Sequence, residues 1–151
     1  MQSRVVGLDL GSRRIGVAVS DGLGLTAQPH STIERHGGVR DLDAVAAVVR
    51  AVGATRIVVG LPLNPEGPRG PGSRSGDAAR RARDFAARLA AHLALPVELI
   101  DESFSTVEAE DVLLAADVSR ARRKQVIDKL AASVILQRWL DEQRRAAGVQ
   151  P

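Results

Sequence analysis

Three acidic positions stand where the surrounding residues are mostly apolar or small: Asp9, the pair Asp101 and Glu102, and Asp128. Asp9 lies inside a short apolar run that is typical of a β-strand, where aspartate is depleted and is seldom buried without a partner or a metal. Asp101 and Glu102 follow a second such run, and Asp128 belongs to a long pattern of helical period. Carboxylates without cysteine or a nearby histidine select Mg²⁺ or Mn²⁺, and two such ions about 4 Å apart can activate water for phosphodiester hydrolysis. We therefore predict a metal site that draws on all three positions.

Each carboxylate also has a plainer interpretation. Asp9 could bond to backbone groups of the turn that follows it, and Asp101 could anchor the next loop and leave Glu102 solvated. Asp128 could pair with Lys124, four residues earlier, although an exposed pair in this orientation contributes only about 0.5 kcal/mol or less. Three separate explanations are then needed, whereas one shared metal site accounts for all three positions.

The stretch from Val5 to Asp21 has to position Asp9. Its first apolar run is followed by a polar turn at residues 11–14, and a second β-rich run covers residues 15–19, which predicts a β-hairpin. Glycines lack a Cβ, so a ligand or another backbone can come close to them. The glycines around Asp9 are Gly7, Gly11 and Gly16.

Strands and helices are predicted along the rest of the chain. Residues 25–34 favour a third strand, and Pro29 places it at or near an edge of the sheet. The apolar spacing of residues 39–52 predicts a helix that Gly53 closes, and residues 56–60 are typical of a strand covered on both faces.

The second half of the sequence alternates in the same way. Residues 61–75 are rich in proline and glycine and predict a mobile loop. Residues 97–100 predict the last strand, which delivers Asp101 and Glu102 at its end, and residues 147–151 should fray. Side chains suited to cap the three helices expected here are Ser75 or Asp77, Ser105 or Thr106, and Ser119.

This order of elements predicts an α/β fold: a mixed five-stranded sheet whose first three strands are antiparallel, with helices packed on it. A length of 151 residues fits a single domain, 1–151. The sequence has no cysteine and no apolar run of membrane-spanning length, so we expect no membrane association and a cytoplasmic location. The net charge is +3, and all basic residues except two lysines are arginines, which suit phosphate contact. Abundant arginine can equally reflect genome composition.

Four separated blocks, residues 7–21, 58–67, 101–106 and 124–140, resemble the YqgF family, also called RuvX. These are bacterial Holliday-junction-resolvase-like proteins of the RNase H superfold that are assigned to pre-16S rRNA processing. The resemblance implies that Asp9, Glu102 and Asp128 hold the catalytic metal, with Asp101 as a helper. The family usually has Arg after its Asp-Glu pair, whereas this chain has Ser103, so one contact to phosphate or carboxylate is missing.

We therefore expect an endonuclease dependent on Mg²⁺ or Mn²⁺ that acts in 5′ processing of pre-16S rRNA, as a monomer or weak homodimer. One alternative is a resolvase of four-way DNA junctions, and a second is a nucleic-acid-binding protein of the same fold without activity. An ATP-binding enzyme of the actin and sugar-kinase class is a more distant rival, since that fold needs two lobes. The residues expected to contact substrate are Arg13, Arg14, Asn64, Arg69, Arg74 and Lys124.

Overall fold

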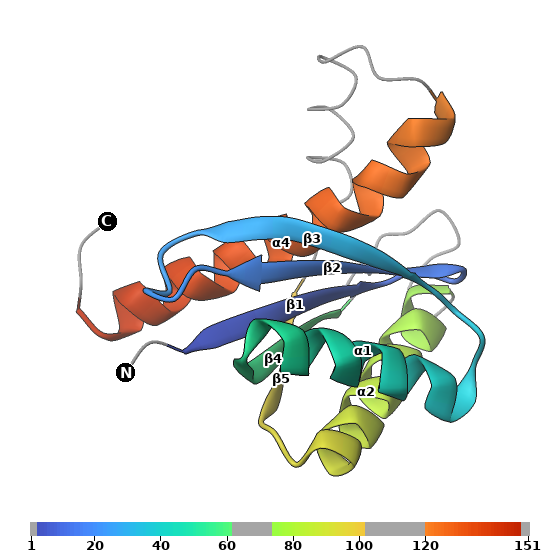
Figure 1. Ribbon diagram of the computed structural model, residues 1–151, viewed down its shortest axis with the longest axis horizontal. Helices are drawn as coiled ribbons and strands as arrows, with labels where there is room; N and C mark the ends of the chain where they lie inside the picture. The colour runs from blue at the N-terminus through green and yellow to red at the C-terminus, as the bar shows by residue number, and fades with distance from the viewer. Residues whose placement is uncertain (1–2, 62–73, 102–119, 149–151) are drawn as a thin grey trace.

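Five strands form one sheet in the order β3-β2-β1-β4-β5 (Figure 1). The computed structural model describes residues 3–61, 74–101 and 120–148, with side chains for 3–61, 78–100 and 127–148. The strands are β1 (Arg4–Leu10), β2 (Arg14–Ser20), β3 (Ala27–Glu34), β4 (Ala54–Leu61) and β5 (Val97–Asp101). The described helices are α1 (Gly38–Val52), α2 (Arg74–Leu93) and α4 (Arg120–Ala146).

The strand directions confirm the predicted mixed sheet. β1 pairs antiparallel with β2, and β2 with β3, whereas β4 runs parallel to β1 and β5 parallel to β4. β3 lies at the edge, as Pro29 predicted, and the register with β2 shifts where Ala18 faces this proline. The parallel strands β1, β4 and β5 therefore end at the same side of the sheet.

Helices cover both faces of the sheet, as the α/β prediction requires. In Figure 1, α1 and α2 lie on one side of the strands and α4 crosses the other side. Alternate residues of each strand feed two separate apolar clusters. The cluster under α1 and α2 includes Val6, Leu8, Val45, Ile57 and Leu89, and the cluster under α4 includes Val5, Ala18, Val58, Ile135 and Leu136.

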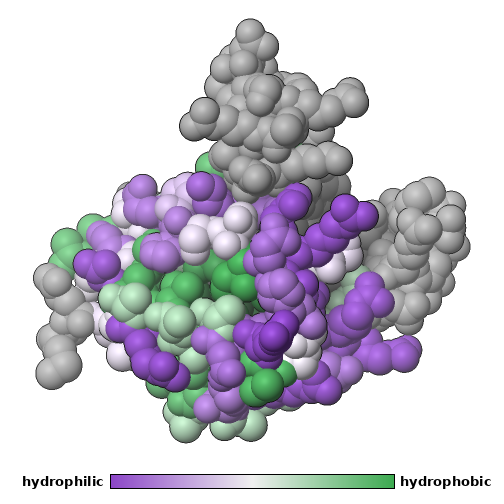
Figure 2. Space-filling view, turned by 45° about the vertical axis from the view of Figure 1, so that its right-hand side comes forward, coloured by the Kyte–Doolittle hydropathy of each residue, from purple (hydrophilic) through white to green (hydrophobic). Residues whose placement is uncertain are grey.

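Two large apolar residues of α4, Trp139 and Leu140, lie at the same face of the sheet. Leu140 is buried, and Trp139 packs against the α4 cluster. Arg56 places its guanidinium carbon 5.8 Å from the centre of the Trp139 ring. Leu140 therefore belongs to the core, and the half-buried Trp139 packs at its edge. Figure 2 shows one face of the molecule, on which hydrophilic side chains surround an apolar area.

The helix ends agree only in part with the prediction. Gly53 closes α1 in the left-handed conformation (φ 71°) and donates its N–H to the Val49 carbonyl, as predicted. The expected caps of α2 are wrong, because the helix begins at Arg74 and so contains Ser75 and Asp77. An acidic residue is favourable in a first turn as well as at a cap, so Asp77 alone could not fix the start. Because α2 begins at Arg74, the last two residues of the loop predicted over residues 61–75 belong to the helix.

The C-terminal half of α4 holds the turn between β2 and β3. The Ala27 N–H donates to Gln137 Oε1 (2.9 Å), and Gln137 Nε2 donates to the Leu25 carbonyl (3.0 Å). Arg144 Nη1 donates to the same carbonyl (2.9 Å). This end of the helix is thus tied to β3 by side chains that reach backbone groups.

Several predictions fall outside the described residues: the body of the 61–75 loop, the helix expected near 105–116, the Ser119 cap and the last residues of the tail. α4 does begin at Arg120, the residue after Ser119. Among the helices that are described, none combines the length and apolar character needed to cross a membrane.

Candidate active site

Asp9 lies on the α4 face of the sheet, near the end of β1. Side chains alternate along a strand, and Val6 and Leu8 belong to the cluster under α1 and α2. A Cβ on Gly7 would instead lie 2.7 Å from Leu136 Cβ on α4. Asp9 shares the side of Gly7, so its half-buried carboxylate is directed to the α4 face.

Gly16 is the residue directly opposite Asp9 in the antiparallel pair of β1 and β2. A Cβ built on Gly16 would lie 1.8 Å from the Asp128 carbonyl oxygen, so the backbone of α4 takes the place of a side chain there. The helix can come this close because the side chains at its contact with the sheet are small: Ala131 and Ala132 are fully buried there. The glycine prediction is therefore confirmed, and the approaching group is a helix backbone. The helix thus places Asp128 beside Gly16, which is the cross-strand neighbour of Asp9.

Arg14 binds the Asp128 side chain. Its Nε donates to Asp128 Oδ2 at 2.8 Å, and both side chains are about three-quarters buried, with 25% and 22% exposed. The hydrogen bond to Asp128 raises the pKa of Arg14 above its usual value, although burial opposes the shift and the charges of Asp128 and Glu34 add to it. The guanidinium therefore stays charged and fixes the Asp128 carboxylate at the turn end of the hairpin.

This contact also bears on the alternative partner of Asp128. The side chain of Lys124, the partner considered from the sequence, lies outside the described residues. The partner that the structure does show, Arg14, is 114 positions away in the sequence. Its position could have been anticipated from the hairpin, because Arg14 lies two residues before Gly16 and therefore on the same face.

The third acidic position lies at the end of β5. Asp101 is the last residue of this strand and is paired with Leu61 of β4, at the side of the sheet where β1 also ends. The side chain of Asp101 and the whole of Glu102 lie outside the described residues. Within the described part of the chain, no three acidic or histidine side chains form a cluster that could bind a metal. Of the predicted ligands, Asp128 lies with its backbone beside Gly16, the residue paired with Asp9.

The predicted substrate contacts divide in the same way. Arg13 is exposed in the turn between β1 and β2, and Arg14 is bound to Asp128. The predicted contacts whose side chains lie outside the described residues are Asn64, Arg69, Arg74 and Lys124.

Arg35 supports the turn that follows Asp9, a role that the sequence did not suggest. Its backbone N–H donates to the Arg13 carbonyl, and its Nη1 donates to the Gly11 carbonyl, both at 2.9 Å. Gly11 in turn donates its N–H to the Arg14 carbonyl at 2.9 Å. The turn is therefore held from inside by its own hydrogen bond and from outside by Arg35.

Asp41, which has only 2% of its surface exposed, holds Arg35 and the chain before α1. It accepts hydrogen bonds from the N–H groups of His36 (2.9 Å) and Gly37 (3.2 Å) and from Arg35 Nε (3.4 Å). Burial acts to raise the pKa of Asp41, but these hydrogen bonds and the charge of Arg35 outweigh it, so the pKa is lowered. Asp41 is thus an ionised, buried support of the active-site turn. The sequence did offer one signal for this role, because an aspartate stands in the first turn of the predicted helix, shortly after two glycines.

Known proteins resemble this chain over most of its length. Residues 3–142 match the family model described as "RuvX: Holliday junction resolvase". A protein of Myxococcus xanthus named "Putative pre-16S rRNA nuclease" is 53% identical over 93% of this chain and 89% of its own length. A protein of Pelotomaculum thermopropionicum with the same name is 51% identical over 96% and 93%.

Solved structures support the fold alone. RuvC of T. thermophilus, in complex with a Holliday junction substrate, superposes with a TM-score of 0.57 at 16% identity, covering 99% of both chains. The yeast mitochondrial resolvase Ydc2 gives 0.51 at 12% identity, covering 97% of this chain and 81% of its own. The sheet is thus of the RNase H-like type that the resemblance implied. With a family model covering nearly all of its length and relatives about half identical to it, the chain belongs to the RuvX family.

Proposed function

We propose that this chain is a hydrolase of the nuclease class, an endonuclease of one domain that acts in 5′ processing of pre-16S rRNA. The observation that carries the proposal is the contact of α4 with β2 across Gly16, because it brings Asp128 next to the strand position opposite Asp9. Two carboxylates at one place, with an arginine beside them, suit phosphodiester chemistry. The names of the relatives that are about half identical support the rRNA substrate.

The donor set fits a hard divalent cation. Both described donors are carboxylates, and the described residues bring neither histidine nor cysteine to them. We propose that Asp9 and Asp128 hold Mg²⁺ or Mn²⁺ together with Glu102, and that Asp101 assists. When bound, such ions supply an activated water and stabilise the leaving oxygen.

Arg14 has two functions in this proposal. It balances the charge of Asp128, which otherwise repels the neighbouring carboxylate, and it orients the carboxylate through the Nε contact. Its charge, together with the exposed guanidinium of Arg13, makes the end of the hairpin attractive to phosphate.

A second candidate is resolution of four-way DNA junctions, favoured by the description of the matching family model. Symmetric cutting of a junction requires two sites related by a twofold axis. The rRNA proposal needs only one site, so the two candidates differ in the oligomeric state that they demand as well as in substrate.

The experiment that tests the proposal compares two substrates under the same conditions. Purified protein with Mg²⁺ or Mn²⁺ is given a structured precursor rRNA and an immobile four-way DNA junction, and we expect faster cleavage of the RNA. Asp9→Asn serves as the blank, and Asp43→Asn, which removes an exposed carboxylate from α1, serves as the matched control.

The outcomes separate the alternatives. Symmetric cutting of the junction with intact RNA would assign the resolvase function and leave the metal site in place. Binding of either substrate without metal-dependent cleavage would assign a binding protein that has lost activity. Equal cleavage by wild type and Asp9→Asn would remove Asp9 from the site.

A further inference from the structure

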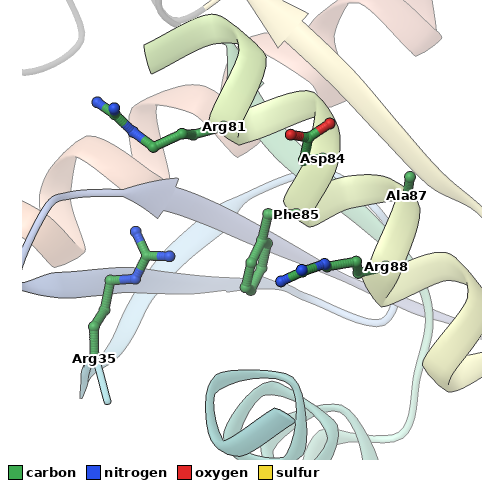
Figure 3. A pocket seen from close by; sticks show the side chains of 6 residues that line it. All are labelled: Arg35, Arg81, Asp84, Phe85, Ala87 and Arg88. Atoms are coloured by element: carbon green, nitrogen blue, oxygen red, sulfur yellow. The ribbon is translucent and has the colours of Figure 1, made fainter. Parts of the chain in front are cut away.

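A pocket of about 470 Å³ lies on the opposite face of the sheet from Asp9, between α2 and the chain that joins β3 to α1. Three arginines line it, together with a single acidic residue and Phe85 (Figure 3). The lining residues are Arg35, Arg81, Asp84, Phe85, Ala87 and Arg88. The proposed chemistry uses none of them.

The pocket presents cations rather than an aromatic surface. Phe85 has only 7% of its surface exposed, and the guanidinium carbon of Arg35 lies 5.7 Å from the centre of its ring. Figure 3 shows the ring between the side chains of Arg35 and Arg88. A base therefore has no free ring on which to stack. The groups left to meet a ligand are guanidinium donors, which suit phosphate.

Arg81 and Arg88 are exposed, and within the described part of the chain neither forms an ion pair or a hydrogen bond. Seven residues separate them, so they lie on one side of α2, two turns apart. Asp84, between them on the same side, is the only acidic residue of the lining. Arg35 is paired with Asp41, so Arg81 and Arg88 are the two cations that face this single carboxylate.

Arg35 connects the pocket to the active-site turn. The same guanidinium that lies over Phe85 donates to the Gly11 carbonyl, two residues after Asp9. Exposed Arg13 belongs to this turn, and its carbonyl accepts the Arg35 N–H. A positively charged path thus runs from Arg14 at the carboxylates, over the turn, to Arg81 and Arg88.

We propose that this pocket binds a backbone phosphate of the nucleic-acid substrate at a distance from the bond that is cut. The proposal rests on the nuclease function proposed above and extends it, because it predicts a substrate that continues over the turn between β1 and β2. RNA and DNA share the phosphodiester group, so the pocket by itself does not select between them.

The test measures binding with chelator present, so that cleavage does not interfere. Labelled single strands of RNA and of DNA, each in a short and a long form, are titrated by fluorescence anisotropy over a salt series. The variant Arg81→Gln/Arg88→Gln is compared with Arg50→Gln/Arg83→Gln, which removes the same charge from exposed positions of α1 and α2 outside the pocket.

We expect the pocket variant to weaken binding of the long strands about tenfold and to lower the salt slope by about one to two, with little change for the short strands. The control variant should stay close to wild type. Asp84→Asn should bind more tightly than wild type, because it removes the one negative charge of the lining. Equal losses in the two double variants, or no gain for Asp84→Asn, would overturn the proposal.

The RNA and DNA arms show which nucleic acid uses the pocket. Wild-type cleavage by Asp9→Asn, with reduced binding by the pocket variant, would refute the catalytic assignment and support the pocket. Loss of cleavage in Asp9→Asn, with unchanged binding by the pocket variant, would do the reverse. All four variants change exposed or half-buried side chains, so circular dichroism should confirm that they fold.

Discussion

The backbone of Asp128 fills the space that a side chain on Gly16 would occupy, and this contact joins the last helix to the hairpin that carries Asp9. A methyl group on residue 16 would lie 1.8 Å from the Asp128 carbonyl oxygen, far inside van der Waals contact. Because the obstructing atom belongs to a helix backbone, α4 as a whole has to move.

Gly16→Ala should therefore destabilise the protein by about 1 to 3 kcal/mol or more, and it should lower cleavage per folded molecule because α4 is displaced and carries Asp128 with it. Gly7→Ala is the matched comparison, since its Cβ would meet Leu136 two turns further along α4. Urea unfolding measures stability, and cleavage per folded molecule measures the site. Equal specific activity in the two variants would show that the Gly16 contact does not position Asp128.

Asp9→Asn should abolish cleavage and weaken binding of Mg²⁺ or Mn²⁺ while the fold is retained. With no divalent ion present, its thermal midpoint should be equal to or higher than that of wild type, because one of two neighbouring negative charges is gone. Calorimetric titration and thermal unfolding in chelator measure the two effects. A lowered midpoint with unchanged ion affinity would assign Asp9 a structural role.

Arg14→Gln should raise the affinity for the divalent ion, whereas Asp9→Asn should lower it. Without the guanidinium, Asp128 is no longer neutralised, so divalent ions should bind more tightly while cleavage falls. Stability should fall by only about 1 kcal/mol or less, because the pair is partly exposed. Arg14→Lys keeps the charge and loses the Nε geometry, so it separates charge from orientation. Unchanged ion affinity in Arg14→Gln would contradict the proposed balance.

Asp41→Asn should lower stability in a manner that depends on pH. The folded pKa of Asp41 is lowered, so its contribution is present above the unfolded pKa of about 3.9 and is lost as the pH falls through the folded value. At pH 7 the variant should lose about 1 to 3 kcal/mol, and the difference from wild type should shrink below about pH 4. Asp43→Asn, on the exposed side of the same helix, should cost under about 1 kcal/mol. A pH-independent loss would show that the charge of Asp41 is irrelevant.

Arg69→Gln/Arg74→Gln tests the prediction that residues 61–75 contribute to substrate binding. If both arginines meet phosphate, affinity should fall and its dependence on salt should flatten, because fewer counterions are released. Anisotropy titrations over a salt series measure both quantities. Affinity that matches wild type throughout the series would leave the segment without a role in binding.

The sequence predicted what local patterns determine. Strand directions, the edge position of β3 and the end of α1 at Gly53 all follow from periodicity, proline and glycine. Asp9 was recognisable because a carboxylate is out of place inside a strand. The Arg14–Asp128 pair was not predicted, because it joins residues 114 positions apart and depends on how α4 docks. The support of the turn by Arg35 and Asp41 was missed because it depends on how the chain between β3 and α1 lies against the turn.

α4 contacts the sheet at Gly16 on β2 and at Ala27 on β3, and neither contact can form before residues 120–146 have been synthesised. Asp128 meets Gly16 in the first half of the helix, and Gln137 holds Ala27 in the second half. Until the ribosome has made α4, the sheet face with Val5 and Val58 has no cover from this helix, and Asp9 lacks its partner carboxylate. If Asp128 acts as proposed, we expect a nascent chain in which α4 has not yet formed to be unable to cut RNA.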